Sequence, residues 1–351
     1  MARIKSGSII KKILWSIVLI LAVAAVSGAY LFYKEFLAPN VRLGKEKPFL
    51  FIPTGAHFED VVRILKEKNL LLDEKSFRWT SERMKYVYHI KSGKYLLKPH
   101  MNNKELITLL RSGEQTPVQL VFNNIRTKDQ LAQRVSEQIE APAFTILNLL
   151  GDPDYTKQLG FTTENILALF IPDTYEFYWN TSADAFIRKM KSEYDKFWTL
   201  AARQKAKNIG FKPAEVSVIA SIVQQETRKE DEKSIIAGVY INRFKKGWRL
   251  EADPTLVFAL GDYSVNRVLN AYKQIDSPYN TYMYGGLPPG PICLPTIASL
   301  NAVLNYTKHN YMYFCAKDDF SGYHSYAATY EQHLLNAHRF QKALNKRGIK
   351  S

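Results

Sequence analysis

The chain has 351 residues, a formal net charge of +15, 46% hydrophobic residues and only two cysteines. This length allows two domains with sizeable hydrophobic cores. The positive charge would suit nucleic acid or an anionic membrane surface. The sequence nevertheless contains no zinc-finger spacing, no RNA-binding aromatic motif and no dense arginine run. We therefore expect no nucleic-acid partner, and the charge alone selects no function.

An uncharged and mostly apolar run covers residues 13–33. As a helix, this run is long enough to cross the core of a bilayer. Four basic residues precede it, so the positive-inside rule places residues 1–12 in the cytoplasm and everything after Lys34 outside. A cleaved signal peptide is the alternative, but the run is longer than a usual signal core and its cleavage sequence is poor. We predict a single-pass anchor in the cytoplasmic (inner) membrane, with a periplasmic remainder.

The composition of the next segments predicts an α+β fold in two parts. Residues 34–47 are expected to form a polar tether, and residues 48–116 a small module. In that module the hydrophobic periodicity predicts a strand at 48–53, helices at 57–71 and 76–87, a second strand, and a last helix. Asn103 is the expected cap of that last helix, at Lys104–Leu110, and Gly113 is its expected stop.

Residues 117–351 are predicted to form a larger mixed α+β domain. The patterns indicate strands at 117–122 and 311–316, and helices at 128–139, 142–150, 183–207, 301–308 and from Thr329 onward. The two cysteines, Cys293 and Cys315, both lie on the predicted outer side of the membrane. The sequence leaves open whether they form a disulfide or remain free thiols.

The stretch that begins at Pro213 combines a helical pattern with an unusual carboxylate. Apolar residues recur at three- and four-residue spacings, at Val216, Ile219 and Val223. The next position on this stripe is Glu226, whose pKa burial would raise, as a general acid near neutral pH requires. The alternative is that Glu226 only ends the helix and pairs with Arg228 or Arg243. The charged run at 228–233 is expected to be a solvated face.

Five blocks around and after Glu226 resemble the signature blocks of the endolytic murein transglycosylases, the MltG/YceG-like family. They are ASIVQQET (220–227), VYINRF (239–244), RLEADPT (249–255), SPYNTY (277–282) and GLPPGPI (286–292). A looser similarity extends from about residue 48 to the C-terminus. The resemblance implies a LysM-like module at 48–116 and a YceG-like catalytic domain at 117–351. LysM-like modules are associated with N-acetylglucosamine-containing glycans, although a spacer role is equally compatible with this stretch.

The resemblance also implies the chemistry. A lytic transglycosylase cleaves the bond between N-acetylmuramic acid and N-acetylglucosamine and leaves 1,6-anhydro ends, so one glutamate can act first as acid and then as base, without metal or cofactor. Glu226 matches the catalytic glutamate of the family. The candidate substrate-binding residues are Asp253, Asn280, Thr281, Tyr282 and Gln225. For Asp253 a loop-fixing role is the alternative, and for Asn280, Thr281 and Tyr282 it is a plain turn. Ser221 and Tyr240 are weaker candidates.

The implied partners are peptidoglycan glycan strands, the inner membrane and penicillin-binding synthases, which suggests a terminase of nascent glycan elongation. Relatives often carry Glu-Gly pairs at two places where this chain has Asn123-Asn124 and Leu167-Ala168. This departure keeps open a non-catalytic glycan-binding scaffold, and a muramidase that admits water is a second alternative. The histidines form no HExxH motif, so we expect no zinc protease. His324 is either a cleft residue or a structural histidine.

Overall fold

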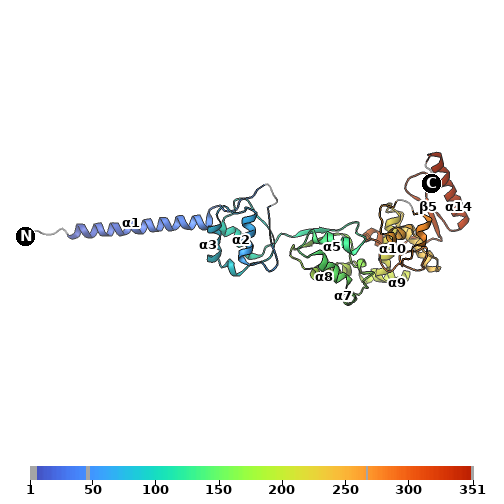
Figure 1. Ribbon diagram of the computed structural model, residues 1–351, viewed down its shortest axis with the longest axis horizontal. Helices are drawn as coiled ribbons and strands as arrows, with labels where there is room; N and C mark the ends of the chain where they lie inside the picture. Colours follow the sequence, from blue (N-terminus) through green and yellow to red (C-terminus); the bar gives the residue numbers. More distant parts are fainter. Residues whose placement is uncertain (1–5, 45–47, 266–267, 349–351) are drawn as a thin grey trace, which may run out of the picture. The chain divides into compact units, whose positions relative to one another are not determined.

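The computed structural model describes residues 6–44, 48–265 and 268–348, with the side chains of residues 6–8 left out. The chain divides into two compact units, which Figure 1 shows from blue to red. The first unit runs to Val118 and also includes Phe177–Asn180. The second unit holds Gln119–Glu176 and the described residues from Thr181 onward. The predicted boundary between residues 116 and 117 thus lies next to this division, but the return of Phe177–Asn180 to the first unit was not predicted.

The first unit begins with α1 (Ser6–Phe32), a single long helix that continues into the short π-helical segment η1 (Tyr33–Leu37). The stretch Ile9–Leu37 is long and apolar enough to cross a membrane, and it is not buried in the protein. Exposed Ile, Leu and Val side chains cover it on all sides. This helix agrees with the predicted apolar segment at 13–33.

The predicted polar tether differs from the structure, because its middle is built into the first unit. Asn40 is 3% exposed, and its side-chain amide donates to the carbonyl of Asp73 and to Oδ1 of Asn103, at 2.9 and 2.7 Å. The backbone N–H of Asp73 donates to Oδ1 of Asn40 at 2.6 Å. Val41 lies in the hydrophobic core. A polar composition suggested a linker, whereas these polar groups bond inside the unit.

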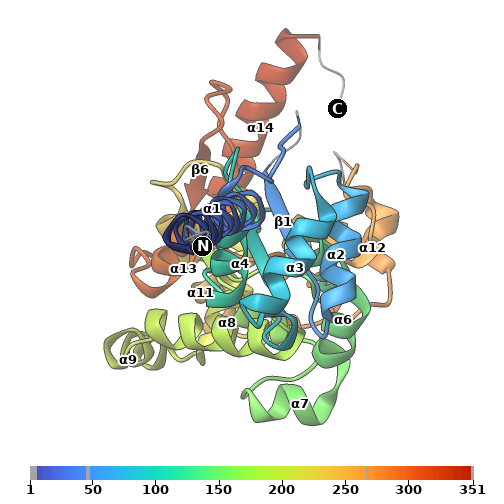
Figure 2. The same cartoon turned by 90° about the vertical axis from the view of Figure 1, so that its left-hand side faces the viewer.

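The rest of the first unit places three helices beside a two-stranded antiparallel sheet (Figure 2). Strands β1 (Phe49–Ile52) and β2 (Gly93–Leu96) pair in register from Phe49 opposite Leu96 to Ile52 opposite Gly93. The helices are α2 (Phe58–Glu67), α3 (Glu74–Arg83) and α4 (Asn103–Ser112), with a 3-10 turn, η2 (Tyr86–Tyr88). This order confirms the predicted sequence of strands and helices. The LysM-like assignment stays a prediction.

The caps of α4 confirm one expectation and correct another. Gly113 ends the helix in the left-handed region at φ 74°, as predicted. The N-cap is Asn102, not Asn103: its Oδ1 accepts from the backbone of Glu105, whose carboxylate accepts from the backbone N–H of Asn102. Asn103 is instead fully buried and donates to the hydroxyl of Ser76 and to the carbonyl of Glu35.

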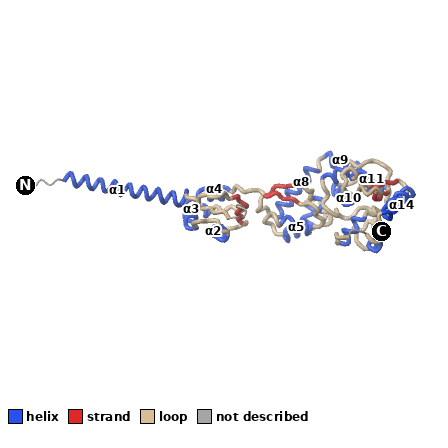
Figure 3. Tube along the Cα trace, turned by 90° about the horizontal axis from the view of Figure 1, so that it is seen from above, coloured by secondary structure: helices blue, strands red, loops and turns tan. Residues whose placement is uncertain are grey.

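The rest of the chain is mainly helical, with two further two-stranded sheets (Figure 3). Strand β3 (Val118–Val121) pairs with β4 (Thr174–Phe177), and β5 (Tyr313–Ala316) forms an antiparallel hairpin with β6 (His324–Ala327). The helical elements are α5 (Lys128–Ser136), α6 (Ala143–Gly151), α7 (Pro153–Gln158), η3 (Ile166–Leu169), α8 (Ala183–Phe197), α9 (Leu200–Ile209), α10 (Pro213–Glu226), α11 (Lys233–Lys245), α12 (Asp253–Leu260), η4 (Asn270–Gln274), α13 (Ile297–Leu304) and α14 (Tyr330–Lys346). The mixed α+β class is therefore confirmed.

The single helix predicted at 183–207 is wrong, because the chain breaks it into α8 and α9. Trp198 is 1% exposed and leaves the helical conformation at the end of α8. The side chain of Thr199 then accepts from the backbone N–H of Ala202 and caps α9. A buried tryptophan followed by a capping threonine ends one helix and starts another.

Candidate active site

Helix α10 carries the catalytic candidate at its last position. It starts with Pro213 at the first turn, and its eight residues from Val216 to Val223 are all buried. It packs against α9, α11, α12 and α13. Glu226 is the final helical residue and keeps part of its surface exposed, and Thr227 follows in an extended conformation. The apolar stripe thus ends in a carboxylate, which lies where the buried helix reaches the surface of the core.

The surroundings of Glu226 shift the pKa of its carboxyl toward neutral pH. Burial raises the pKa of this carboxyl from 4.5 to about 7, and the negative charge of Asp253 adds to the rise. The hydroxyl of Tyr240, which donates to Oε1 of Glu226 at 2.5 Å, and the charge of Arg243 partly offset it. A carboxyl that exchanges its proton around pH 7 can serve as a general acid and, once deprotonated, as a general base.

Helix α11 supplies Tyr240 and Arg243, the two groups that limit the rise in the pKa of Glu226. Tyr240 is 1% exposed, and its ring packs edge-on against Phe314 of β5. Burial and the adjacent Glu226 raise the pKa of Tyr240 well above its usual value, so its hydroxyl stays a donor. Arg243 is also buried, and its guanidinium donates to the carbonyls of Met312 and Leu250 at 2.7 and 2.5 Å. The arginine is therefore fixed by the backbone of two neighbouring segments.

The second carboxylate near Glu226 is Asp253, the first residue of α12. It is exposed, and its Oδ1 accepts from the hydroxyl of Tyr282 at 2.5 Å. Burial and this contact raise the pKa of Tyr282, so the phenol stays protonated. The negative charge of Asp253 acts on Glu226 and the charge of Glu226 acts on Tyr282. Asp253 and Tyr282 thus form a polar pair beside the candidate acid.

The two residues before Tyr282 bond inside the protein. Asn280 is fully buried, donates to the carbonyls of Lys273 and Ile275, and accepts from the backbone N–H of Tyr282. Thr281 is 2% exposed, and its hydroxyl accepts from the backbone N–H of Ala252 at 3.0 Å. These side chains fix the loop that carries Tyr282 beside the start of α12. Their polar atoms point into the loop and not toward solvent.

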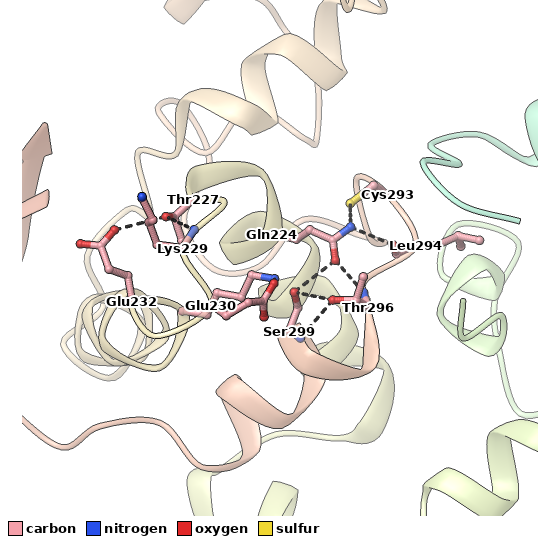
Figure 4. A network of polar contacts seen from close by, with 10 residues as sticks. Gln224, Thr227, Lys229, Glu230, Glu232, Cys293, Leu294, Thr296 and Ser299 are labelled. Atoms are coloured by element: carbon pink, nitrogen blue, oxygen red, sulfur yellow. Dashed lines mark hydrogen bonds and ion pairs between the residues drawn. The ribbon is translucent and has the colours of Figure 1, made fainter. Parts of the chain in front are cut away.

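Gln224 and Gln225 connect the end of α10 to the segment 293–299, the first of them as Figure 4 shows. The amide of Gln224 donates to the carbonyl of Leu294 and accepts from the backbone N–H of Thr296. Gln225 accepts from the guanidinium of Arg126 at 2.8 Å and lies 3.4 Å from Sγ of Cys293. Gln225 is only partly buried, so it can still present an edge to a ligand.

Cys293 and Cys315 are free thiols in this structure. Cys293 is buried beneath the glutamines, and burial raises the pKa of its thiol to about 11. Such a thiol is a small buried side chain and not a nucleophile. Of the two alternatives left open by the sequence, the structure therefore shows the free form.

A buried carboxylate that the sequence did not single out contacts Thr227, the residue that follows Glu226. Glu232, just before α11, is 3% exposed and accepts from the hydroxyls of Thr227 and Tyr326, at 3.2 and 2.8 Å. Its oxygens also accept from the backbone N–H of His324 and contact Nδ1 of that ring, at 2.8 and 3.0 Å. The predicted solvated face at 228–233 is therefore wrong at its end, since Lys233 is buried too. Spacing by four from Glu232 to Ile236 and Tyr240 was the available signal.

Glu226 opens into a pocket of about 590 Å³ between the α10–α11 connection and the β5–β6 hairpin. Thr227, Arg228 and Lys229 line it from the connection, and Figure 4 shows Thr227 and Lys229 beside Glu232. The opposite wall comes from the hairpin and α14: Ala316, Lys317, Phe320, Gly322, Tyr323, His324 and Phe340. His324 is therefore a cleft residue and a hydrogen-bonded residue at once.

The two departures from the family pattern lie elsewhere. Leu167 and Ala168 are buried in η3. Asn123 and Asn124 line a separate pocket with residues of α5 and α6. Neither pair lines the pocket that contains Glu226. Among the described residues no group of three or more His, Cys, Asp or Glu side chains is arranged to hold a metal ion.

Comparisons with known proteins point to one family. The model of the YceG-like family matches residues 50–339, most of the chain. An endolytic murein transglycosylase of Bacillus subtilis is 28% identical over 315 residues, which cover 84% of this chain and 85% of that protein. An endolytic murein transglycosylase of Streptococcus pneumoniae is 27% identical over an alignment of 362 positions that covers 93% of this chain. The match spans 65% of the length of the pneumococcal protein.

A solved structure is also similar. The crystal structure of a YceG-like protein from Listeria monocytogenes superposes with a TM-score of 0.54 at 28% identity. The superposition covers 83% of this chain and 99% of that one. It extends the similarity from sequence blocks to the fold.

Proposed function

Because the chain belongs to the YceG-like family, as the match over residues 50–339 shows, we propose that it cleaves peptidoglycan glycan strands as an endolytic murein lytic transglycosylase. The observation that carries this proposal is the environment of Glu226. A partly exposed carboxyl with a pKa of about 7 lies at the end of a buried helix and opens into a pocket. The relatives named endolytic murein transglycosylases support the same reaction.

The first step needs a proton on the oxygen that leaves. At neutral pH a large fraction of Glu226 is protonated, so this carboxyl can donate to the glycosidic oxygen between N-acetylmuramic acid and N-acetylglucosamine. Tyr240 holds Oε1, which orients the carboxyl and leaves Oε2 available for the substrate. As the bond breaks, positive charge develops on the sugar ring, and the carboxylate formed on Glu226 supplies a negative charge that can stabilise it.

The second step needs a base but no second nucleophile from the protein. The deprotonated Glu226 takes the proton of the sugar's own C6 hydroxyl, which attacks the anomeric carbon and closes a 1,6-anhydro ring. One carboxyl with a pKa near the working pH therefore completes the cycle. The product leaves with no water added.

Substrate contacts are assigned to side chains whose polar atoms are accessible. Asp253 and Tyr282 present their paired oxygens next to Glu226, and the amide of Gln225, which Arg126 holds, is partly exposed. They are the proposed hydrogen-bonding partners of acetamido and hydroxyl groups. The buried Asn280 and Thr281 act through Tyr282 by fixing its loop.

We also propose that α1 is a membrane anchor, with the N-terminus in the cytoplasm and the chain after Lys34 outside in the periplasm. Its support is the apolar stretch Ile9–Leu37, preceded in the sequence by basic residues. An enzyme anchored in this way acts on nascent glycan close to the membrane. That location fits a terminase of strand elongation that works beside penicillin-binding synthases.

Mass analysis of the products tests the reaction. The full-length protein in detergent micelles is incubated with uncrosslinked glycan strands, beside the variants Glu226→Gln and Glu215→Gln. Glu215 is a matched control, since it is a glutamate in the first turn of the same helix. We expect fragments lighter by one water than hydrolytic products from the parent and from Glu215→Gln, and none from Glu226→Gln. Fragments with ordinary reducing ends would show a muramidase, and strands left intact by the parent would indicate a scaffold.

A further inference from the structure

The pocket beside Glu226 carries more positive charge than a neutral sugar requires. Arg228, Lys229 and Lys317 all line it. Within the described part of the chain, Glu226 is the only carboxylate that lines it. Lys317 is partly neutralised by Asp319 at 3.1 Å, whereas Arg228 makes no ion pair among the described residues. Three cationic side chains therefore line the pocket, while the carboxylates of Asp231 and Glu232 lie behind its wall, where they bond to Tyr323 and His324.

Lys229 is held in place within this pocket. Its backbone N–H donates to the hydroxyl of Thr227, next to the candidate acid. Its ammonium lies 4.7 Å from the centre of the Tyr323 ring, and its side chain is half-buried beside Gly322. A lysine that packs on an aromatic ring loses less conformational freedom when it binds an anion than a freely solvated lysine does.

The wall opposite Lys229 is also fixed. The buried Glu232 binds the backbone and ring of His324, and it binds Thr227 at the same time. This carboxylate therefore ties the β5–β6 hairpin to the residue that follows Glu226. The positive groups and the catalytic candidate are thus held at a set spacing, as a binding subsite requires.

We propose that this pocket binds the carboxylates of the peptide that is attached to N-acetylmuramic acid, so that peptide-bearing strands are the preferred substrate. The proposal rests on the proposed function, because that function supplies the glycan on which the peptide is carried. The sugars of a peptide-bearing strand are uncharged, because the lactyl carboxyl of N-acetylmuramic acid is used in the amide bond to the peptide. The peptide carboxylates are therefore the part of this substrate that matches the cationic side chains. Lys229 and Lys317 pair with its carboxylates while the glycosidic bond lies at Glu226.

Binding to the inactive full-length Glu226→Gln protein tests the subsite without any need for catalysis. In micelles, calorimetry compares glycan fragments that carry peptides with fragments stripped of peptides by an amidase, whose freed lactyl carboxyls are then capped as amides. A third set carries peptides whose carboxylates are amidated. We expect peptide-bearing fragments to bind about tenfold more tightly, as is typical of a charge-assisted contact. Amidated fragments are expected to bind like stripped ones, and the preference is expected to weaken with added salt.

Substitution of the two lysines by methionine removes their positive charges and keeps an unbranched apolar side chain of similar length. In the triple variant with Glu226→Gln, Lys229→Met and Lys317→Met, we expect the preference for peptide-bearing over stripped fragments to vanish. It is expected to persist with Lys207→Met, a control at an exposed lysine in α9. Each ratio comes from one protein preparation, so a loss of folded protein does not change it. Equal affinity for peptide-bearing and stripped fragments, or a preference that survives the double methionine change, would overturn the proposal. If the parent cleaves no strands while peptide-bearing fragments still bind more tightly than stripped ones, only the proposed function is overturned.

Discussion

Removal of one hydroxyl, that of Tyr240, is expected to move the pH range in which the protein works. This hydroxyl donates to Oε1 of Glu226 at 2.5 Å and lowers the pKa of that carboxyl. A hydrogen bond to a charged group contributes about 1.5–3 kcal/mol, and one pKa unit corresponds to about 1.4 kcal/mol. In Tyr240→Phe the pKa of Glu226 should therefore rise from about 7 to about 8–9.

The assay is the pH dependence of kcat/KM on uncrosslinked glycan. A general acid works while it is protonated, so the activity of the parent should fall as the pH rises through about 7. In Tyr240→Phe the midpoint of this fall should lie about one to two pH units higher. Phenylalanine keeps the ring against Phe314, so the packing of α11 is retained.

A matched control separates this effect from a general loss of tyrosine hydroxyls. Tyr155 of α7 donates to Asp184 at 2.8 Å in the same unit, and neither residue lines the pocket with Glu226. Tyr155→Phe is expected to leave the midpoint unchanged. A midpoint in Tyr240→Phe that stays at the parent value or moves to lower pH would refute the assignment of Tyr240 as the donor to the catalytic acid.

Three further changes test the energetics in thermal or denaturant unfolding. Glu226→Gln should stabilise the protein at pH 8 by up to about 3 kcal/mol. The pKa of Glu226 is raised on folding, so the parent loses stability as the pH rises from 4.5 through 7 and the buried carboxyl becomes charged. Equal stability of the parent and the variant at pH 8 would contradict this. Gly290→Ala should lower the free energy of unfolding by about 1–3 kcal/mol, because the new Cβ atom would lie 2.1 Å from the carbonyl oxygen of Glu164. An unfolding midpoint equal to that of the parent would count against this close approach. Asn40→Ala should lower the stability of the first unit by about 1–3 kcal/mol, and an unchanged stability would favour the polar tether predicted from the sequence.

The position of Glu226 could be predicted because it depends on one helix. A 3.6-residue period places every member of an apolar stripe on one face, and a carboxylate on that stripe stands out in the sequence. The partners of Glu226 could not be predicted in the same way. The contact with Tyr240 depends on how α10 and α11 cross, and the contact between Asp253 and Tyr282 joins residues 29 positions apart.

The errors at Asn40, Asn103 and Glu232 share a physical cause: each polar side chain was given a local or solvated role, whereas it bonds inside its unit. Asn40 and Asn103 bond to each other inside the first unit, and Glu232 bonds to β6 inside the second. Composition gives no sign of such partners, because they come from distant parts of the chain. The break between α8 and α9 has a local cause, and the pair Trp198-Thr199 would have revealed it.

The origin of the oxygen at the new chain ends tests the central claim most directly. The full-length protein cleaves uncrosslinked glycan in water enriched in oxygen-18, beside Glu226→Gln. If Glu226 acts as acid and then as base for the C6 hydroxyl, the new ends carry no heavy oxygen, and Glu226→Gln makes no ends. Heavy oxygen in the new ends would show that water attacks, and would contradict the transglycosylase mechanism.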